Sequence, residues 1–131
     1  MATGDHRPEG VRLHQRSREL ELSYAGGEHY RLSCEYLRVY SPSAEVRGHG
    51  PGQEVLQTGK QGVNISAIRP VGHYALQLVF DDGHDTGLYS WDYLYQLAVE
   101  QEARWEDYLR RLREAGANRD PEVQVIKFDP S

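Results

Sequence analysis

The fold of this chain is decided by one stretch, Phe80-Asp-Asp-Gly-His-Asp-Thr-Gly-Leu-Tyr-Ser-Trp-Asp-Tyr-Leu94. Asp82-Gly83 predicts a tight two-residue turn, because glycine adopts the positive φ that such turns need and aspartate tolerates it. Residues 74–80 before the turn place apolar side chains at every second position, which indicates a strand. A second short strand and a helix capped by Ser90 are expected to follow. The stretch therefore predicts a β-hairpin that leads into a helix.

A similar order of elements is expected nearer the N-terminus. Alternating apolar residues precede a turn at Ala25-Gly-Gly-Glu28, residues 29–33 return as a partner strand, and Ser33 caps a short helix over 34–40. Strand, small polar cap, acid in the first turn and Tyr-Leu recur in the same order in both places. This recurrence indicates either a duplicated ββα unit or cap chemistry that the two segments share without duplication.

The remaining segments complete the predicted architecture. Residues 41–62 form a long irregular loop, which is either functional or merely mobile. A strand is expected over 63–69, and helical spacing runs from Trp91 to a stop at Gly116, with a bend near Glu100. The sequence predicts an α+β fold: an antiparallel sheet of about five strands from two hairpin-helix units, with a long C-terminal helical segment packed on it.

The predicted organisation is one domain with loose ends. Residues 1–10 are expected to be disordered, residues 11–116 to form a single domain, and residues 117–131 to form a flexible tail. The predicted core consists of Leu22, Leu32, Ile65, Leu76, Leu78, Phe80, Trp91, Leu94, Ala98, Trp105 and Leu109.

Composition excludes several classes of function. A net charge of −5 argues against nucleic-acid binding, which needs clustered lysine and arginine. No apolar run reaches the roughly 20 residues that span a bilayer, so no membrane association is expected. The first residues lack the apolar core of a signal peptide, which indicates a cytoplasmic protein. The single cysteine, Cys34, allows neither an internal disulfide nor a cysteine-built zinc site.

The turn after residue 80 holds the candidate metal ligands. His84, Asp82 and Asp85 offer the nitrogen and oxygen atoms that a divalent metal such as zinc or iron accepts. The alternative is a solvated turn in which Asp82 only serves the turn geometry. No cofactor is otherwise expected, because no iron-binding histidine–carboxylate pair and no Gly-x-Ser-x-Gly hydrolase motif occurs.

A partner or ligand surface is expected around the long loop. Its candidate residues are Arg38, Arg47, His49 and Trp91. The glycine-rich run over 48–52 lacks the Gly-Lys-Ser/Thr ending of a phosphate-binding loop, which argues against phosphate binding there. Arg38 and Arg47 flank the loop and are candidates to hold an anion, the alternative being that both are simply solvated.

Three segments together resemble the gamma-butyrobetaine hydroxylase-like N-terminal domain family: Tyr36–Ser43, Val63–Gly72 and Phe80–Leu94. In the carnitine-pathway hydroxylases this small domain precedes a separate catalytic domain that binds iron and 2-oxoglutarate. The resemblance implies that the small domain stands alone here. Relatives of it are also fused to P-loop ATPases that carry iron–sulfur clusters, which implies a docking or delivery role.

The resemblance also implies a metal site that this chain alters. In those hydroxylases three cysteines and one histidine hold a zinc ion. The corresponding positions here are Ser41, Ser43, Val46 and His84. Serine and valine do not replace thiolates on zinc, so the family's zinc site is not expected in this chain.

The leading hypothesis is a non-enzymatic domain that binds a protein partner, with a link to iron–sulfur or redox-enzyme maturation. The alternative is a metal-binding module centred on His84. A third hypothesis is a small-molecule or anion pocket lined by residues 41–62 and Arg38.

Overall fold

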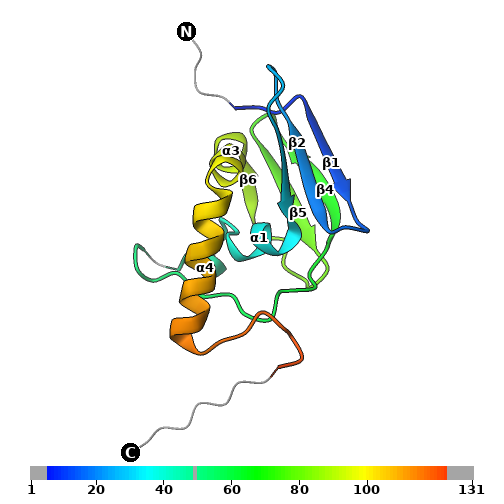
Figure 1. Ribbon diagram of the computed structural model, residues 1–131. Helices are drawn as coiled ribbons and strands as arrows, with labels where there is room; N and C mark the ends of the chain where they lie inside the picture. The colour runs from blue at the N-terminus through cyan, green and yellow to red at the C-terminus, as the bar shows by residue number, and fades with distance from the viewer. Residues whose placement is uncertain (1–5, 49, 124–131) are drawn as a thin grey trace, which may run out of the picture.

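The computed structural model describes residues 6–48 and 50–123, in which strands and helices form an α+β fold as predicted (Figure 1). In chain order the elements are β1 (Gly10–His14), β2 (Glu19–Ser23), β3 (His29–Ser33), α1 (Cys34–Val39), α2 (Ala44–Arg47), β4 (Ile65–Val71), β5 (Ala75–Phe80), β6 (Leu88–Ser90), α3 (Trp91–Val99) and α4 (Gln101–Ala115).

The strands form two antiparallel sheets of three strands each, in the orders β1-β2-β3 and β4-β5-β6. The prediction of one sheet of about five strands from two-stranded units is therefore wrong. Each unit is a three-stranded meander followed by a helix, and we call them the first unit (residues 10–39) and the second unit (residues 65–99). Pro70 in β4 lacks the N–H that another strand would need, which suits β4 to the edge of its own sheet.

The hairpin after residue 80 exists, but its connection is longer than two residues. Gln77 pairs with Leu88 and Ala75 with Ser90, so the chain between Phe80 and Leu88 leaves the ladder. Gly83 has a φ of 92°, which fits the predicted need for glycine at this turn. The longer connection turns the side chain of His84 into the interior, where it is 3% exposed.

Helices α1 and α3 begin at the predicted serine caps. The hydroxyl of Ser33 accepts a hydrogen bond from the amide of Tyr36 (3.0 Å), and the hydroxyl of Ser90 accepts one from the amide of Tyr93 (3.1 Å). Each cap satisfies one of the free amides of the first helical turn. The helical segment breaks at Glu100, as predicted, and α4 ends at Gly116, whose φ of 65° is left-handed.

The same two tyrosines tie the units together in a reciprocal way. The hydroxyl of Tyr36 donates to the carbonyl of Leu97 in α3 (2.7 Å), and that of Tyr93 donates to the carbonyl of Tyr40 at the end of α1 (2.6 Å). Each tyrosine lies three residues after its serine cap, and each acceptor lies seven residues after the other unit's cap. Both carbonyls belong to the last turn of a helix, where no intrahelical partner exists.

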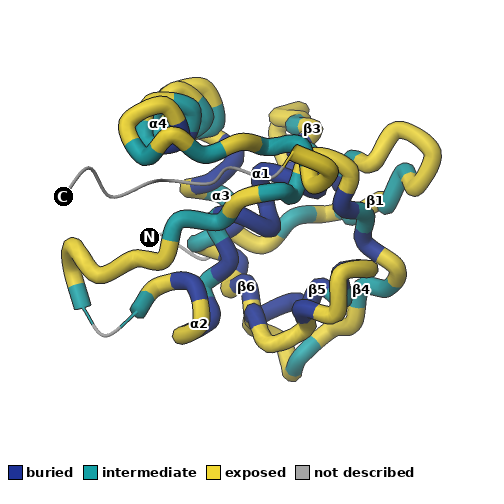
Figure 2. Tube along the Cα trace, turned by 90° about the horizontal axis from the view of Figure 1, so that it is seen from below, coloured by how far each residue is buried: buried dark blue, intermediate teal, exposed yellow. Residues whose placement is uncertain are grey.

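One apolar cluster joins both sheets with α1 and α3, and the buried trace runs through the centre of Figure 2, whereas a second, smaller cluster joins Val39 to Tyr108 and Leu112 of α4. Of the predicted core residues, Trp105 and Leu109 are only partly buried, and the others are buried. The apolar face of α4 instead buries Tyr108 and Leu112. Because the core is shared, neither sheet buries its apolar face without the other.

Both described ends of the chain contact the fold. His6 stacks on Tyr95 with ring centres 4.1 Å apart, and Glu9 donates its amide to the carbonyl of Ser23. After α4, the guanidinium of Arg119 donates two hydrogen bonds to the buried carboxylate of Glu35 (2.7 and 2.8 Å). The domain boundaries at residues 10 and 116 stay predictions. No helix in the described parts of the chain is both long and apolar enough to cross a bilayer.

Candidate functional site

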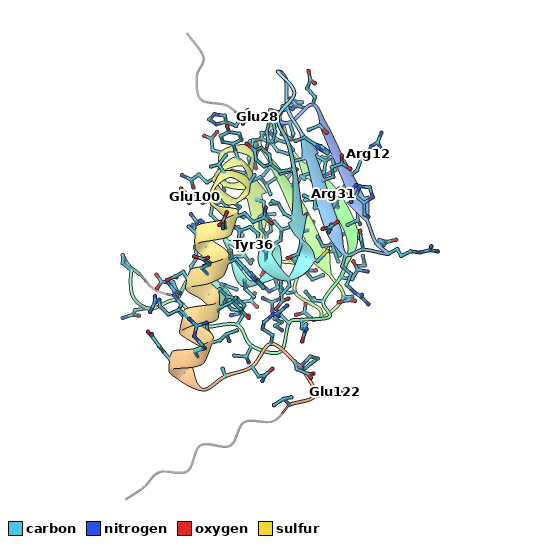
Figure 3. The ribbon with its side chains drawn as sticks, in the orientation of Figure 1. Arg12, Glu28, Arg31, Tyr36, Glu100 and Glu122 are labelled. Atoms are coloured by element: carbon cyan, nitrogen blue, oxygen red, sulfur yellow. The ribbon has the colours of Figure 1, made fainter. Side chains whose placement is uncertain are left out.

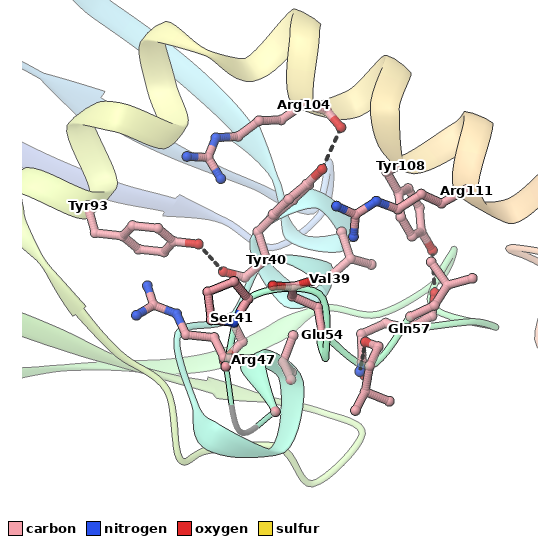
Figure 4. A pocket seen from close by; sticks show the side chains of 16 residues that line it. Val39, Tyr40, Ser41, Arg47, Glu54, Gln57, Tyr93, Arg104, Tyr108 and Arg111 are labelled. Carbon is pink, nitrogen blue, oxygen red and sulfur yellow. Dashed lines mark hydrogen bonds between the residues drawn. The ribbon is translucent and has the colours of Figure 1, made fainter.

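A pocket lies between the segment that follows α1 and one side of α4 (Figure 4). Its volume is about 620 Å³, within the range of small-molecule sites. We call it the basic pocket, because three arginines and three tyrosines line it together with one acidic residue, Glu54. These six residues are Arg47, Arg104, Arg111, Tyr40, Tyr93 and Tyr108.

The three arginines differ in how they are held. Arg104 pairs with Glu100 (2.8 Å) and Arg111 with Asp107 (3.0 Å), both along α4. Arg47 stacks over the ring of Tyr93 at 4.9 Å, and no carboxylate within the described residues pairs with its guanidinium. A cation held by an aromatic face keeps its hydrogen-bond donors free. Arg47 is therefore the arginine best placed to bind an anion.

The tyrosine hydroxyls fasten the pocket walls. Tyr40 donates to the carbonyl of Arg104 (2.7 Å), and Tyr108 donates to the carbonyl of Gln57 (2.8 Å). Burial raises the pKa of both Tyr40 and Tyr108, so both hydroxyls stay protonated and keep donating at neutral pH. These bonds connect α1, α4 and the long loop before any ligand arrives, which indicates a preformed pocket.

The turn between α2 and the long loop requires glycine at position 48. Gly48 ends the four-residue helix α2 with a φ of 72°, and a Cβ at this position would collide with the carbonyl of Gln53. The amide of Val55 donates to the carbonyl of Val46 (2.8 Å), which closes the loop on α2. Arg47 is held at the pocket edge by this tight closure.

His84 lies behind the pocket in a cluster of hydroxyl groups. Its Nε2 is 2.8 Å from the Oγ of Ser41 and 3.4 Å from the Oγ of Ser43, and its Nδ1 is 3.8 Å from a carboxylate oxygen of Glu45. Burial, with the nearby charge of Arg38, lowers the pKa of His84. The ring is thus neutral at physiological pH and holds residues 41–43 against the second unit.

This serine–histidine pair is not arranged for hydrolysis. Ser41 is 1% exposed, and the distance from His84 to Glu45 exceeds that of a hydrogen bond. A nucleophile must meet its substrate, and its base must be oriented by a third group. The arrangement fits a structural role for Ser41.

The predicted metal ligands Asp82 and Asp85 lie apart from the His84 ring contacts. Asp82 pairs with Arg38 (2.9 Å) and Lys60 (2.8 Å), and its other oxygen accepts the amide of His84 (3.2 Å). Burial alone raises the pKa of Asp82, but the bonds from Lys60, His84 and Arg38 outweigh it and lower the pKa overall. Asp85 is exposed. Among the described residues, no three histidine, cysteine or acidic side chains are grouped to hold a metal ion.

The sequence model of the family called gamma-butyrobetaine hydroxylase-like, N-terminal, matches residues 11–95 of this chain. This chain belongs to that family. A protein solved in solution by NMR is 50% identical with a TM-score of 0.80, covering 94% of this chain and 97% of that one. A second NMR structure is 54% identical with a TM-score of 0.77, covering 98% of both chains.

A more distant relative comes from Acidithiobacillus ferrooxidans and is described as a protein of unknown function in the DUF971 family. Its crystal structure is 38% identical with a TM-score of 0.62, and the match covers 74% of this chain and 98% of that one. The curated proteins include no match to this chain. The family of this chain thus includes a member that is described as a protein of unknown function.

The zinc site that the family resemblance implies does not fit the residues present. Ser41, Ser43 and His84 do meet at one point, and Val46 is buried. Neutral hydroxyls and an aliphatic side chain offer zinc no thiolate. The position holds a hydrogen-bonded cluster whose nitrogen already has a hydroxyl partner.

The four residues of the predicted partner surface do not gather at one place. Arg47 lines the basic pocket, but Arg38 is 7% exposed and bonded to Asp82 and Gln57. Trp91 is 8% exposed, and its indole donates to the carbonyl of His73 (2.7 Å). His49 lies outside the described residues.

Sequence reasoning missed most of the pocket. Arg104, Tyr108 and Arg111 stand at helical spacing on one side of α4, and that spacing was the available signal. That spacing did not lead to a predicted site, because charged residues on an outer helix are usually solvated. Tyr93, three residues after the Ser90 cap, was not among the predicted site residues.

Proposed function

We propose that this protein is a non-enzymatic accessory module that binds an acidic segment of a protein partner in the basic pocket. The observation that carries the proposal is Arg47, which is stacked on Tyr93 without a carboxylate partner among the described residues, at the edge of a pocket of about 620 Å³ in a chain whose net charge is −5. Acidic groups are repelled by most of such a surface, so the pocket is where they are attracted.

The shape and lining of the pocket support a protein segment. Tyr40, Tyr93 and Tyr108 supply broad apolar faces, and Val39 and Leu56 also line the pocket. Tyrosine and arginine are the residues most enriched where proteins bind one another. An acidic segment with one apolar or aromatic side chain satisfies both parts of the lining. The resemblance to domains fused with iron–sulfur ATPases suggests redox-enzyme maturation as the setting.

The test uses charge reversal at Arg47, the arginine without an acidic partner in the described chain. The untagged full chain and its Arg47→Glu variant are titrated with a peptide of alternating glutamate and phenylalanine, observed through amide chemical shifts. We expect the peptide to shift the amides of residues 46–48 and 54–57. Arg47→Glu should lower the affinity for the peptide by about tenfold, equivalent to about 1.4 kcal/mol. Equal binding by both proteins would reject the pocket as the site.

The matched control is Arg12→Glu, which makes the same charge change on β1, across the molecule from α4 (Figure 3). A comparable loss with Arg12→Glu would show that only net charge matters, and would also reject the proposal. Recovery of the same stoichiometric partner from native extract by the unaltered chain and by Arg12→Glu, but not by Arg47→Glu, extends the test to the natural ligand.

The alternative of a metal-binding module at His84 stays a hypothesis with a direct measurement. Elemental analysis of untagged protein, compared with its His84→Ala variant, decides it. One metal per chain that is lost in the variant would favour the alternative, and metal well below one per chain in both would remove it.

A further inference from the structure

A second hollow lies on the other side of α4, bounded by α1, the end of α3 and Arg119. Its volume is about 830 Å³. We call it the acidic groove. It shares no lining residue with the basic pocket, although α4 contributes to both.

The floor of the acidic groove is apolar and open. Trp105 and Leu109 of α4 are half-buried in it, and Val99 at the end of α3 remains 49% exposed. The ring of Tyr36 meets that of Trp105 edge-on at 6.4 Å, and the guanidinium of Arg119 covers the tryptophan at 5.1 Å. A partly covered tryptophan supported from below is the kind of residue that anchors an interface.

The rim of the groove carries negative charge that no neighbour neutralises. Glu102 and Glu106 are exposed, stand four residues apart on α4, and form no ion pair within the described residues. Like charges at this spacing destabilise a helix by roughly 0.2–0.5 kcal/mol. The nearby Arg110 does not relieve them, because it pairs with Asp107 (2.6 Å) and Glu114 (2.9 Å).

The remaining charges of the groove cancel each other. Glu35 is buried, and its carboxylate takes both hydrogen bonds from Arg119. The free charge of the lining is thus that of Glu102 and Glu106. A ligand that enters must supply positive charge beside an apolar group.

We propose that the acidic groove docks a basic amphipathic helix of a protein partner, with its apolar face on Trp105, Leu109 and Val99 and its lysine or arginine side chains on Glu102 and Glu106. A helix fits because Glu102, Glu106 and Leu109 stand four and three residues apart along α4, which gives a straight row against which a second helix packs, and Val99 lies at the end of that row on α3. Nucleic acids and anionic lipid surfaces are disfavoured by the two carboxylates.

The experiment titrates the full chain with a 14-residue helical peptide of leucine and lysine, and with its leucine–glutamate counterpart. Binding is followed at the indole N–H of Trp105 and the methyl groups of Val99. We expect shifts with the lysine peptide and none at these positions with the glutamate peptide. The variant Glu102→Gln/Glu106→Gln should lower the affinity for the lysine peptide by about tenfold.

The matched control Glu9→Gln/Glu122→Gln removes two exposed carboxylates elsewhere and should leave the affinity unchanged. Arg47→Glu, which tests the basic pocket, should also leave it unchanged, so the two proposals fail separately. Equal weakening by the control, equal binding of both peptides, or no shift at Trp105 would overturn the docking proposal. Concentration-dependent self-association that Glu102→Gln/Glu106→Gln abolishes would instead assign the groove to a second copy of the chain.

Discussion

The first and second units follow one plan up to the end of their helices and differ in what comes next. Each unit is a three-stranded meander whose last strand runs into a serine-capped helix, and each helix offers a tyrosine to the other. After α1 the chain forms the short helix α2, which ends at Arg47, and then the long loop, whereas after α3 it forms α4. The shared plan builds the frame, and the unshared segments supply the charges that have no partner in the frame, Arg47 of the basic pocket and Glu102 and Glu106 of the acidic groove.

The largest effect is expected from removing the equivalent leucines. Leu37 and Leu94 each follow the tyrosine of their unit, and both are 0% exposed. Leu37→Ala and Leu94→Ala should each lower the free energy of unfolding by about 2–5 kcal/mol, because each leaves a cavity in the shared core. Urea denaturation measures the loss. A loss below about 1 kcal/mol in either variant would mean that its unit is not part of a common core.

The reciprocal hydroxyls should show a smaller, unequal effect. Tyr36→Phe leaves the carbonyl of Leu97 unpaired in a buried place and should cost about 1–3 kcal/mol. Tyr93→Phe should cost less, because its ring is half-buried and water can reach the carbonyl of Tyr40. Thermal unfolding of both single variants and the double variant measures this. Equal costs would contradict the difference in burial.

The two serine caps should contribute about equally. Ser33→Ala and Ser90→Ala each remove one hydroxyl that accepts from the third helical amide, at an expected cost of about 1 kcal/mol. Replacement by aspartate keeps an acceptor and should restore most of the stability. If Ser90→Ala were neutral in urea denaturation, the cap of α3 would be dispensable and the parallel between the units would end at α1.

The smallest expected effects are on the pH dependence of stability, in which the two units should differ. The pKa of His84 in the second unit is lowered, so the unfolded chain binds its proton first and stability falls as pH drops below 6.5. Hydrogen bonds from His29 and His14 lower the pKa of Glu21 in the first unit from 4.5 to about 2, so its contribution is lost only as pH falls below 4.5. His84→Gln should remove the upper of the two declines in melting temperature.

The control for that measurement is His73→Gln at the exposed turn between β4 and β5. It should leave both declines in place. If His84→Gln left the decline below pH 6.5 unchanged, another group would be responsible for it.

Local chemistry made part of this structure predictable. The caps at Ser33 and Ser90 follow from a small polar residue placed before a helical pattern, and the core positions follow from periodicity. The alternation of apolar residues along a strand indicates which face of the strand is buried. It does not indicate which strand lies beside it, so the division into two sheets could not be predicted from the sequence. The pocket could not be predicted for a similar reason. Arg47 and Arg104 line it together only because of the path of residues 41–62, and that segment has no periodic pattern from which its path could be predicted.

The candidate sites share one more structural feature, which lies between them. Tyr36 lines the acidic groove and Tyr93 lines the basic pocket, and each hydroxyl is bonded to the helix that bears the other ring. Because each hydroxyl already has its acceptor in the other unit, these two hydrogen bonds hold one wall of each site in place before any ligand arrives.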